Sequence, residues 1–323
     1  MNGIDYLLES NDYFVRYNTL LNLKELPSSN EPVIKAKNNM LLDVLIIKIV
    51  DELKYWDSSI ISSHKSAGQL YHKLVFLSDI GITRNDLGMA SVIDTISKER
   101  SPEGLIQLSM NVSTSYGGTG SDTKAWALCD APLLLYATIK MNGKINSDDK
   151  RAIDYLVNLS FENGWHCETS KELGGFRGPG RKGDPCPYAT LIMLKLLTLC
   201  DEYKNSAMVE NGINSLLNLW ENSKTIHPYM FYMGTDFRKL KVPFIWYDIV
   251  NVVDVLSHYD IAIKDKRFKD MLNMINDKKN NDGLYTPESV WKAWSEFDFG
   301  QKNEPSMWLT YVVYNINKRV SVY

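Results

Sequence analysis

The chain has 323 residues, of which 44% are hydrophobic, and its formal net charge at pH 7 is −3. This length and apolar content allow a large buried core and exclude wholesale disorder. The slightly acidic balance argues against a general nucleic-acid-binding protein, which carries a basic excess. No apolar run reaches the ~20 residues of a transmembrane helix, and no leader pattern is recognisable. We therefore expect a cytoplasmic protein without nucleic acid as a partner, whose four cysteines are reduced thiols.

The N-terminal part predicts helices. Apolar residues at helical spacing indicate two short helices over residues 3–26 and one long helix over residues 33–54. The segment between them, residues 27–32, begins and ends with proline and is predicted to be a loop. The first 64 residues are therefore expected to form N-terminal helices that precede the rest of the fold.

Between residues 65 and 317, helical segments recur at a regular interval. Apolar helices are predicted after four prolines, over residues 133–139, 188–199, 244–256 and 306–316. These prolines, at positions 132, 187, 243 and 305, are 55, 56 and 62 residues apart. Amphipathic helices are predicted between them, over residues 148–159, 207–220 and 265–277.

Apolar and amphipathic helices that alternate at a fixed period are typical of helical hairpins stacked side by side. The sequence thus predicts an all-α fold with a single domain, residues 1–323, in which residues 65–317 are the hairpin repeats. Closure into an (α/α) toroid of inner and outer helices is the economical way to bury the apolar helices. An open solenoid is the structural alternative.

One loop, at residues 174–188, is rich in groups that can bind an anion. Its five glycines and three prolines rule out a regular helix, and it opens directly into an apolar helix. The N-terminus of a helix favours bound anions. A similar basic loop precedes the next apolar helix. Together the two loops predict a positively charged rim that holds an anionic group, made of Arg177, Arg181, Lys182, Arg238, Lys239 and Lys241. The alternative is ordinary solvated surface.

The apolar helices also carry aromatic and acidic residues. Tyr188, Trp246 and Trp308 are predicted to line a central cavity, where aromatic faces suit an apolar ligand or a developing cation. Asp130, Asp184 and Asp248 lie at or near the starts of these helices. Buried carboxylates with shifted pKa values serve as general acids or bases. Helix capping is the other explanation, most of all for Asp184.

A metal site is a further hypothesis. Asp184 and Cys186 place a hard and a soft ligand two residues apart, and Cys167 or His166 from the preceding turn can supply a third ligand for zinc. The remaining histidines show no partner pattern and receive no role. Cys200 ends an apolar helix and is expected in the core.

The loop motif resembles that of the terpenoid cyclase and protein prenyltransferase superfamily. Gly-Gly-Phe-Arg-Gly at residues 174–178 and the Asp184, Cys186, Tyr188 series are similar to the prenyltransferase β-subunit repeat, with one extra residue before the tyrosine. The resemblance implies a double-layered α/α toroid and zinc ligands at Asp184 and Cys186. The family's third ligand, a histidine in a later repeat, is Ser306 here, and neither acidic motif of the cyclases is present.

These features favour an enzyme of the prenyltransferase or terpene cyclase type, acting on an isoprenoid or another amphipathic anionic substrate. The basic rim would hold the head group, and one of the three aspartates would handle a proton. One alternative is a carbohydrate-active toroid, a glycosidase or lyase, whose cleft would be acidic. The other is a non-catalytic ligand-binding scaffold. Nothing in the sequence indicates the oligomeric state.

Overall fold

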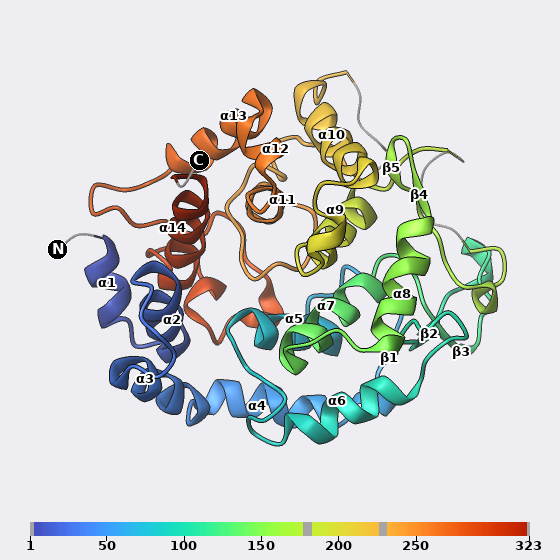
Figure 1. The fold of residues 1–323 in the computed structure, drawn as a ribbon, viewed down its shortest axis with the longest axis horizontal. Coiled ribbons are helices and arrows are strands. Elements are labelled where there is room, and N and C mark those ends of the chain that lie inside the picture. The colour runs from blue at the N-terminus through green and yellow to red at the C-terminus, as the bar shows by residue number, and fades with distance from the viewer. Residues whose placement is uncertain (1–2, 177–182, 226–230, 322–323) are drawn as a thin grey trace. The chain divides into compact units, whose positions relative to one another are not determined.

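The computed structural model describes residues 3–176, 183–225 and 231–321 (Figure 1). The chain divides into two compact units. The central unit is residues 51–233, and the terminal unit combines residues 1–50 with residues 234–323. The described residues contain fourteen α-helices and five short strands, so the mainly helical prediction is confirmed. Among these helices, none has the length and apolar content that crossing a membrane requires.

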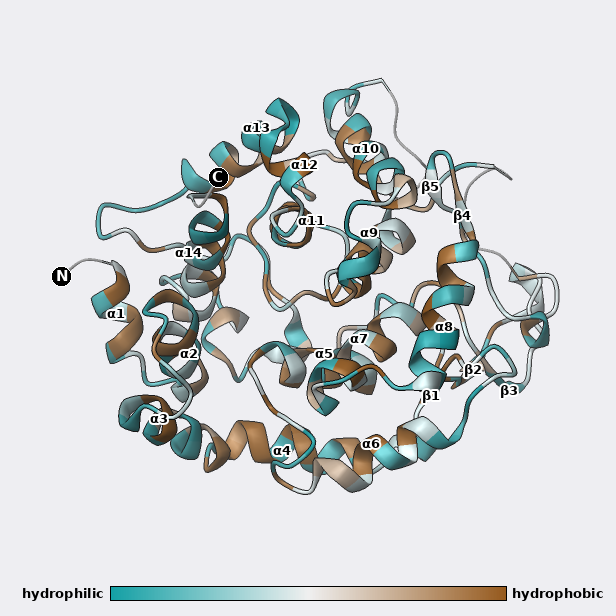
Figure 2. Cartoon of the chain, in the orientation of Figure 1, coloured by the Kyte–Doolittle hydropathy of each residue, from teal (hydrophilic) through white to brown (hydrophobic). Residues whose placement is uncertain are grey.

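In the central unit, apolar helices are covered by amphipathic ones. Helix α5 packs on α7, α7 packs on α8 and α9, and α9 packs on α10. Every residue of α9 is buried, whereas α8 and α10 combine hydrophobic and hydrophilic residues (Figure 2). The helices of this unit are α5 (Leu70–Asp79), α6 (Met89–Lys98), α7 (Ala131–Asn142), α8 (Ser147–Asn158), α9 (Pro187–Leu197) and α10 (Ala207–Glu221).

In the terminal unit, the two ends of the chain pack together. Helix α14 contacts α1, α2 and α11. The Nδ2 of Asn22 donates to the hydroxyl of Tyr311 at 2.7 Å, and the ammonium of Lys318 donates to the carbonyl of Asn22 at 2.7 Å. The helices here are α1 (Gly3–Glu9), α2 (Tyr13–Asn18), α3 (Glu31–Leu41), α11 (Ile249–Leu256), α12 (Asp260–Lys264), α13 (Lys266–Asn276) and α14 (Met307–Ser321). Helix α4 (Val44–Leu53) crosses the boundary between the units at residue 50.

Three of the four apolar helices lie where they are predicted, as α7, α9 and α14. The fourth is shorter than predicted, because α11 begins at Ile249 and not at residue 244. Asp248 sets this start. Its backbone is extended, and its Oδ1 accepts hydrogen bonds from the backbone N–H groups of Val250 and Asn251, each at 3.0 Å. A side chain that caps two free amides begins a helix at the next residue.

The long helix predicted over residues 33–54 is in fact two helices, α3 and α4. The break lies at Leu42 and Asp43. The Oδ1 of Asp43 accepts hydrogen bonds from the backbone N–H groups of Leu45 and Ile46, at 2.8 and 3.2 Å. An internal N-cap therefore divides the continuous apolar pattern.

The central unit also contains short strands, which the helical prediction did not include. Strand β2 (Leu108–Asn111) pairs in parallel with β1 (Ile60–Ile61) and antiparallel with β3 (Asp122–Ala125), and β4 (Ser160–Phe161) pairs with β5 (Gly164–Trp165). The residues of β2 are alternately buried and half-buried. This period of two is the pattern of a strand with one face in the core.

Gly212 in α10 marks the closest approach of that helix to β5. A Cβ built at Gly212 would lie 2.9 Å from Cζ3 of Trp165, whose ring is fully buried and whose Nε1 donates to the carbonyl of Leu156 at 2.9 Å. The anchored ring has little room to move. We expect Gly212→Ala to destabilise the protein by about 1–3 kcal/mol through overpacking.

Urea unfolding measures this effect. Alanine improves helix propensity by about 1 kcal/mol over glycine, so a net loss can come only from the contact with Trp165. Asn211→Ala, one residue earlier on the same helix, is the matched control and is expected to be neutral or stabilising. A Gly212→Ala variant as stable as the wild type would contradict the packing argument.

Candidate functional site

A buried carboxylate paired with an imidazole is the most reactive arrangement in the central unit. Asp130 immediately precedes α7 and is 0% exposed. A hydrogen bond of 2.7 Å joins its Oδ2 to Nε2 of His64, whose side chain is 15% exposed. The Oδ1 of Asp130 accepts from the backbone N–H of Ala127 at 3.4 Å. The partly exposed imidazole of His64 therefore lies between the buried carboxylate and solvent.

Two side chains from the start of α5 hold the His64 loop in place. The carbonyl of His64 accepts hydrogen bonds from the hydroxyl of Tyr71 at 2.7 Å and from Nε2 of His72 at 3.0 Å. The Tyr71 and His72 rings pack with their centroids 4.0 Å apart. Burial lowers the pKa of His72 to about 3, so this imidazole is a neutral hydrogen-bond donor. His64 is therefore positioned by its backbone, and its ring is left for Asp130.

The protonation of the pair reflects two opposing effects. Burial raises the pKa of Asp130, while the hydrogen bond and charge of His64 lower it. Burial raises the pKa values of Tyr71 and Tyr188 well above the ordinary value. Nearby Tyr188 and Asp130 raise that of Tyr71 further, and nearby Cys129 and Asp130 raise that of Tyr188 further. Both phenols are therefore neutral near neutral pH. Within this group, the hydrogen-bonded pair is Asp130 and His64.

Three cysteines meet next to this pair. The nearby thiols of Cys167 and Cys186, together with burial, raise the pKa of Cys129 well above its usual value. Cys186 is also the N-cap of α9, where its Sγ accepts from the backbone N–H of Ala189 at 3.5 Å. The predicted cap role of Asp184 is therefore wrong. Cys200 is buried in the core, as expected.

The described residues do not form a site that fits a zinc ion. No group of three or more His, Cys, Asp or Glu side chains there is arranged to hold a metal ion. Asp184 is half-buried, and its charge raises the pKa of His166 against a larger lowering by burial. Zinc binding by Asp184, Cys186 and Cys167 therefore stays a prediction.

Asp248, in the terminal unit, is the second buried carboxylate that the sequence predicts. Its Oδ1 caps α11, while its Oδ2 is buried and has no hydrogen-bond partner within the described residues. Burial raises the pKa of Asp248 to about 7, against the opposing effects of the two cap hydrogen bonds and of Lys241. This carboxyl is therefore partly protonated at neutral pH.

The predicted basic rim is only partly described. Arg177, Arg181 and Lys182 lie outside the described residues. In the terminal unit, the ammonium groups of Lys239 and Lys241 lie 3.4 and 2.8 Å from the two carboxylate oxygens of Asp236. Lys241 is itself buried, with Nζ 5.8 Å from the ring centroid of Trp291. The carbonyl of Arg238 accepts from Lys278 at 2.5 Å. One acidic side chain thus offsets part of the predicted positive charge.

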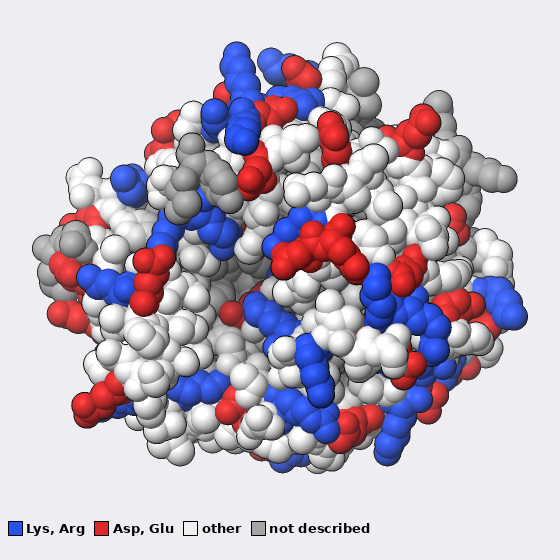
Figure 3. All heavy atoms as spheres, in the orientation of Figure 1, with Lys and Arg blue, Asp and Glu red and all other residues white. Residues whose placement is uncertain are grey.

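Mixed charge is also visible on the molecular surface. On the face drawn in Figure 3, acidic and basic side chains lie beside one another.

Of the three aromatic residues predicted to line a central cavity, Tyr188 belongs to the central unit, and Trp246 and Trp308 belong to the terminal unit. Tyr188 is 1% exposed and lies near Asp130 and Cys129 in the central unit. Trp308 is a core residue of the terminal unit, stacked on Tyr311 at 5.1 Å and edge-on to Phe14 at 5.4 Å. Trp246 is half-buried, and its carbonyl accepts from Asn251 at 2.9 Å. Of the three, Tyr188 is the one placed beside a reactive group.

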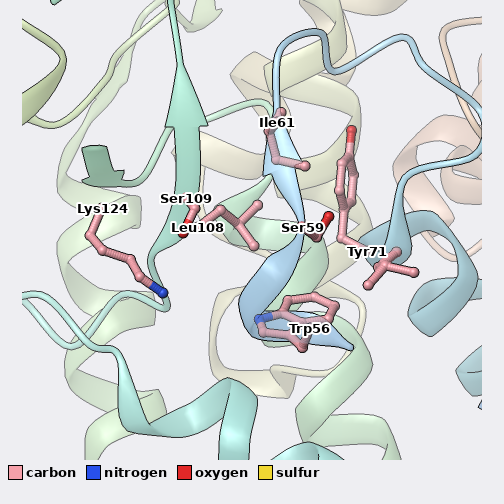
Figure 4. Close-up of a pocket in the computed structure, with 8 residues that line it drawn as sticks. Trp56, Ser59, Ile61, Tyr71, Leu108, Ser109 and Lys124 are labelled. Carbon is pink, nitrogen blue, oxygen red and sulfur yellow. The ribbon is translucent and has the colours of Figure 1, made fainter. Parts of the chain in front are cut away.

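A small pocket reaches the other side of Tyr71 (Figure 4). The side chains of Ile61 and Leu108 approach it from two adjacent strands, with Trp56 below them and Lys124 on the third strand. The lining residues are Trp56, Ser59, Ile61, Leu70, Tyr71, Leu108, Ser109 and Lys124. Tyr71 therefore both lines this pocket and, through its hydroxyl, contacts the carbonyl of His64.

Sequence reasoning missed His64. It lies 66 positions before Asp130 and belongs to no motif. The pairing depends on how the loop before α5 meets the start of α7, and no local pattern indicates it.

No protein-family model matches the chain, and the curated proteins include none with significant similarity to it. The chemistry of the site is therefore the basis for the functional argument.

Proposed function

We propose that this protein is an enzyme that transfers a proton to or from an isoprenoid or another amphipathic substrate, with Asp130 and His64 as its acid–base pair. The observation that carries the proposal is the 2.7 Å hydrogen bond between a fully buried carboxylate and a half-buried imidazole. Perturbed titratable pairs of this kind are concentrated at catalytic sites.

The surroundings of the pair suit protonation of an apolar group. Burial favours the protonated form of Asp130, and His64 can restore the proton after transfer because it lies between the carboxyl group and solvent. Tyr71 and Tyr188 present neutral aromatic rings near the carboxylate. A cation that develops on a hydrocarbon chain is attracted to such faces.

The toroid that this function needs is part of the proposal. In the central unit, the apolar helices α7 and α9 are covered by the amphipathic α8 and α10. In the terminal unit, α1 and α2 pack on α14, so the first and last helices are neighbours, as closure of a ring requires. The anionic head group would be held by the basic residues that the sequence predicts, including Arg177, Arg181 and Lys182.

Product analysis tests the proposal. The full chain would be incubated with farnesyl diphosphate and, separately, with squalene, and the products identified by mass spectrometry. We expect turnover of at least one substrate to fall by about 100-fold or more in Asp130→Asn. His64→Gln should also slow it. Asp94→Asn, at an exposed carboxylate of α6, is the control and should leave turnover unchanged.

Two results would count against an enzyme of this type. One is full activity in Asp130→Asn. The other is that neither substrate is converted and neither shifts the melting temperature of the wild-type protein. The non-catalytic scaffold would then be the better explanation.

A further inference from the structure

A groove of about 240 Å³ is lined by α10 and by the turn of the β4–β5 hairpin, two elements that pack against each other in the central unit (Figure 1). The part of the groove on α10 is a row of four asparagines, Asn211, Asn214, Asn218 and Asn222. Steps of three or four residues place them on one face of the helix. At about 1.5 Å per residue, the row is about 16 Å long.

This amide row is not what a solvated helix face requires. Asparagine favours a helix less than the lysine, glutamate, glutamine or arginine that usually cover exposed faces. Residues 211–220 contain no charged side chain, whereas the polar faces of the amphipathic helices α8 and α13 carry aspartate, lysine and arginine. The composition of this face therefore points to a ligand that needs amide groups.

The groove offers hydrogen bonds and little charge. Each asparagine amide carries an acceptor oxygen and two N–H donors. In the hairpin turn, a hydrogen bond of 2.8 Å joins Oδ1 of Asn163 to Nε2 of His166, and Nδ2 of Asn163 donates to the carbonyl of Gly183 at 3.1 Å. These two bonds hold the amide in place. Glu162 is the one charged side chain among the described residues that line the groove, so a neutral ligand fits better than an anion.

We propose that this groove binds a neutral carbohydrate of one or two sugar rings. A sugar presents hydroxyl groups, each of which both donates and accepts hydrogen bonds, around an apolar C–H face. The amide row matches the hydroxyls, while Leu219 and Pro185 provide apolar surface. The volume lies just below the range of about 300–1,000 Å³ that drug-sized ligands occupy, which suits a short saccharide. This inference does not depend on the proposed enzymatic function.

An extended peptide is the other neutral ligand with regularly spaced donors and acceptors. Its backbone repeats every two residues, so three repeats cover about 20 Å. The three steps of the asparagine row cover only about 16 Å. The peptide groups would therefore fall out of step with the amides along the row, and the spacing favours the sugar.

Saturation-transfer difference NMR on the full chain tests the proposal. The probes are the neutral disaccharides maltose, cellobiose, lactose and trehalose. We expect saturation transfer to at least one of them. Asn214→Ala combined with Asn218→Ala should weaken its binding by about tenfold or more, because hydrogen-bonding groups are lost. Asn205→Ala is the matched control. It changes an exposed asparagine in the turn before α10 that does not line the groove, and it should bind as the wild type does.

Asn218→Arg gives a second test that does not depend on the double variant folding. Asn218 is exposed, so a longer side chain is tolerated there and would fill the groove and abolish binding. Saturation transfer to none of the four disaccharides would overturn the proposal, and so would equal binding by the wild type and the Asn218→Arg variant. Binding of tetra-alanine that Asn218→Arg abolishes, without binding of any sugar, would show that the ligand is a peptide.

Discussion

Replacement of Asp79 by asparagine is expected to lower the free energy of unfolding by about 3–5 kcal/mol. Asp79, the last residue of α5, accepts hydrogen bonds from Lys195 at 2.8 Å, from Lys140 at 3.1 Å and from the hydroxyl of Tyr136 at 2.8 Å. Lys195 lies on α9 and is 5% exposed. Without the carboxylate, its ammonium group would be buried with its compensating charge removed.

The same network predicts how stability depends on acid. Burial alone would raise the pKa of Asp79, but Lys195 and Lys140 lower it to about 2 from the ordinary 3.8. A carboxylate whose pKa is lower in the folded state stabilises the protein above its unfolded pKa and loses this contribution as pH falls. The wild type should therefore lose stability between about pH 4 and pH 2, and Asp79→Asn should lose less over this interval.

Urea unfolding at neutral pH, followed by circular dichroism, measures the main effect. The double variant Asp79→Leu with Lys195→Met removes both charges and should recover at least half of the loss, because an apolar pair replaces a buried ion pair at little cost. Glu296→Gln breaks an exposed ion pair with Lys48 and should cost less than about 1 kcal/mol. Equal losses in the single and double variants would show that the buried ammonium is not the cause.

Asp248→Asn is expected to change the pH dependence of stability by up to about 4 kcal/mol. Burial raises the pKa of Asp248 from 3.8 to about 7 in the folded protein. A carboxyl with a raised pKa stabilises the fold fully below its unfolded pKa, and this contribution is lost as pH rises through 7. Asparagine keeps a cap oxygen for Val250 and Asn251 and does not ionise.

The measurement is the difference in free energy of unfolding between variant and wild type at pH 4 and at pH 8. We expect similar stability at pH 4 and a more stable variant at pH 8. Asp43→Asn, at the cap of α4, is the control because Asp43 is also a capping aspartate but is not buried. Parallel pH profiles for Asp248→Asn and the wild type would mean that Asp248 titrates normally.

The positions of the apolar helices could be predicted because their cause is local. Helices α7 and α9 are apolar around nearly their whole circumference, and each has a proline in its first turn. The start of α11 and the break between α3 and α4 were not predicted. In each case one aspartate, Asp248 or Asp43, caps backbone amides inside an apolar run. A capping residue and an ordinary polar residue look alike in a single sequence, so these boundaries could not be placed.

The composition of the candidate site was partly predictable as well. Asp130, Cys186 and Tyr188 lie at the starts of helices α7 and α9, which the prolines at positions 132 and 187 predict. The structure places the three residues near one another in the central unit. The partners of these residues were not predictable. In the predicted basic rim, Lys239 and Lys241 both contact Asp236, a carboxylate close to them in the sequence.

The sequence by itself determined the helical class and the acidic, aromatic and thiol groups at the helix starts, because periodicity, proline and composition act over a few residues. Only the tertiary structure decided which of these groups meet. The loop of His64 reaches Asp130 because Tyr71 and His72 hold its carbonyl. Such contacts depend on packing between segments far apart in the chain, and no local pattern encodes that packing.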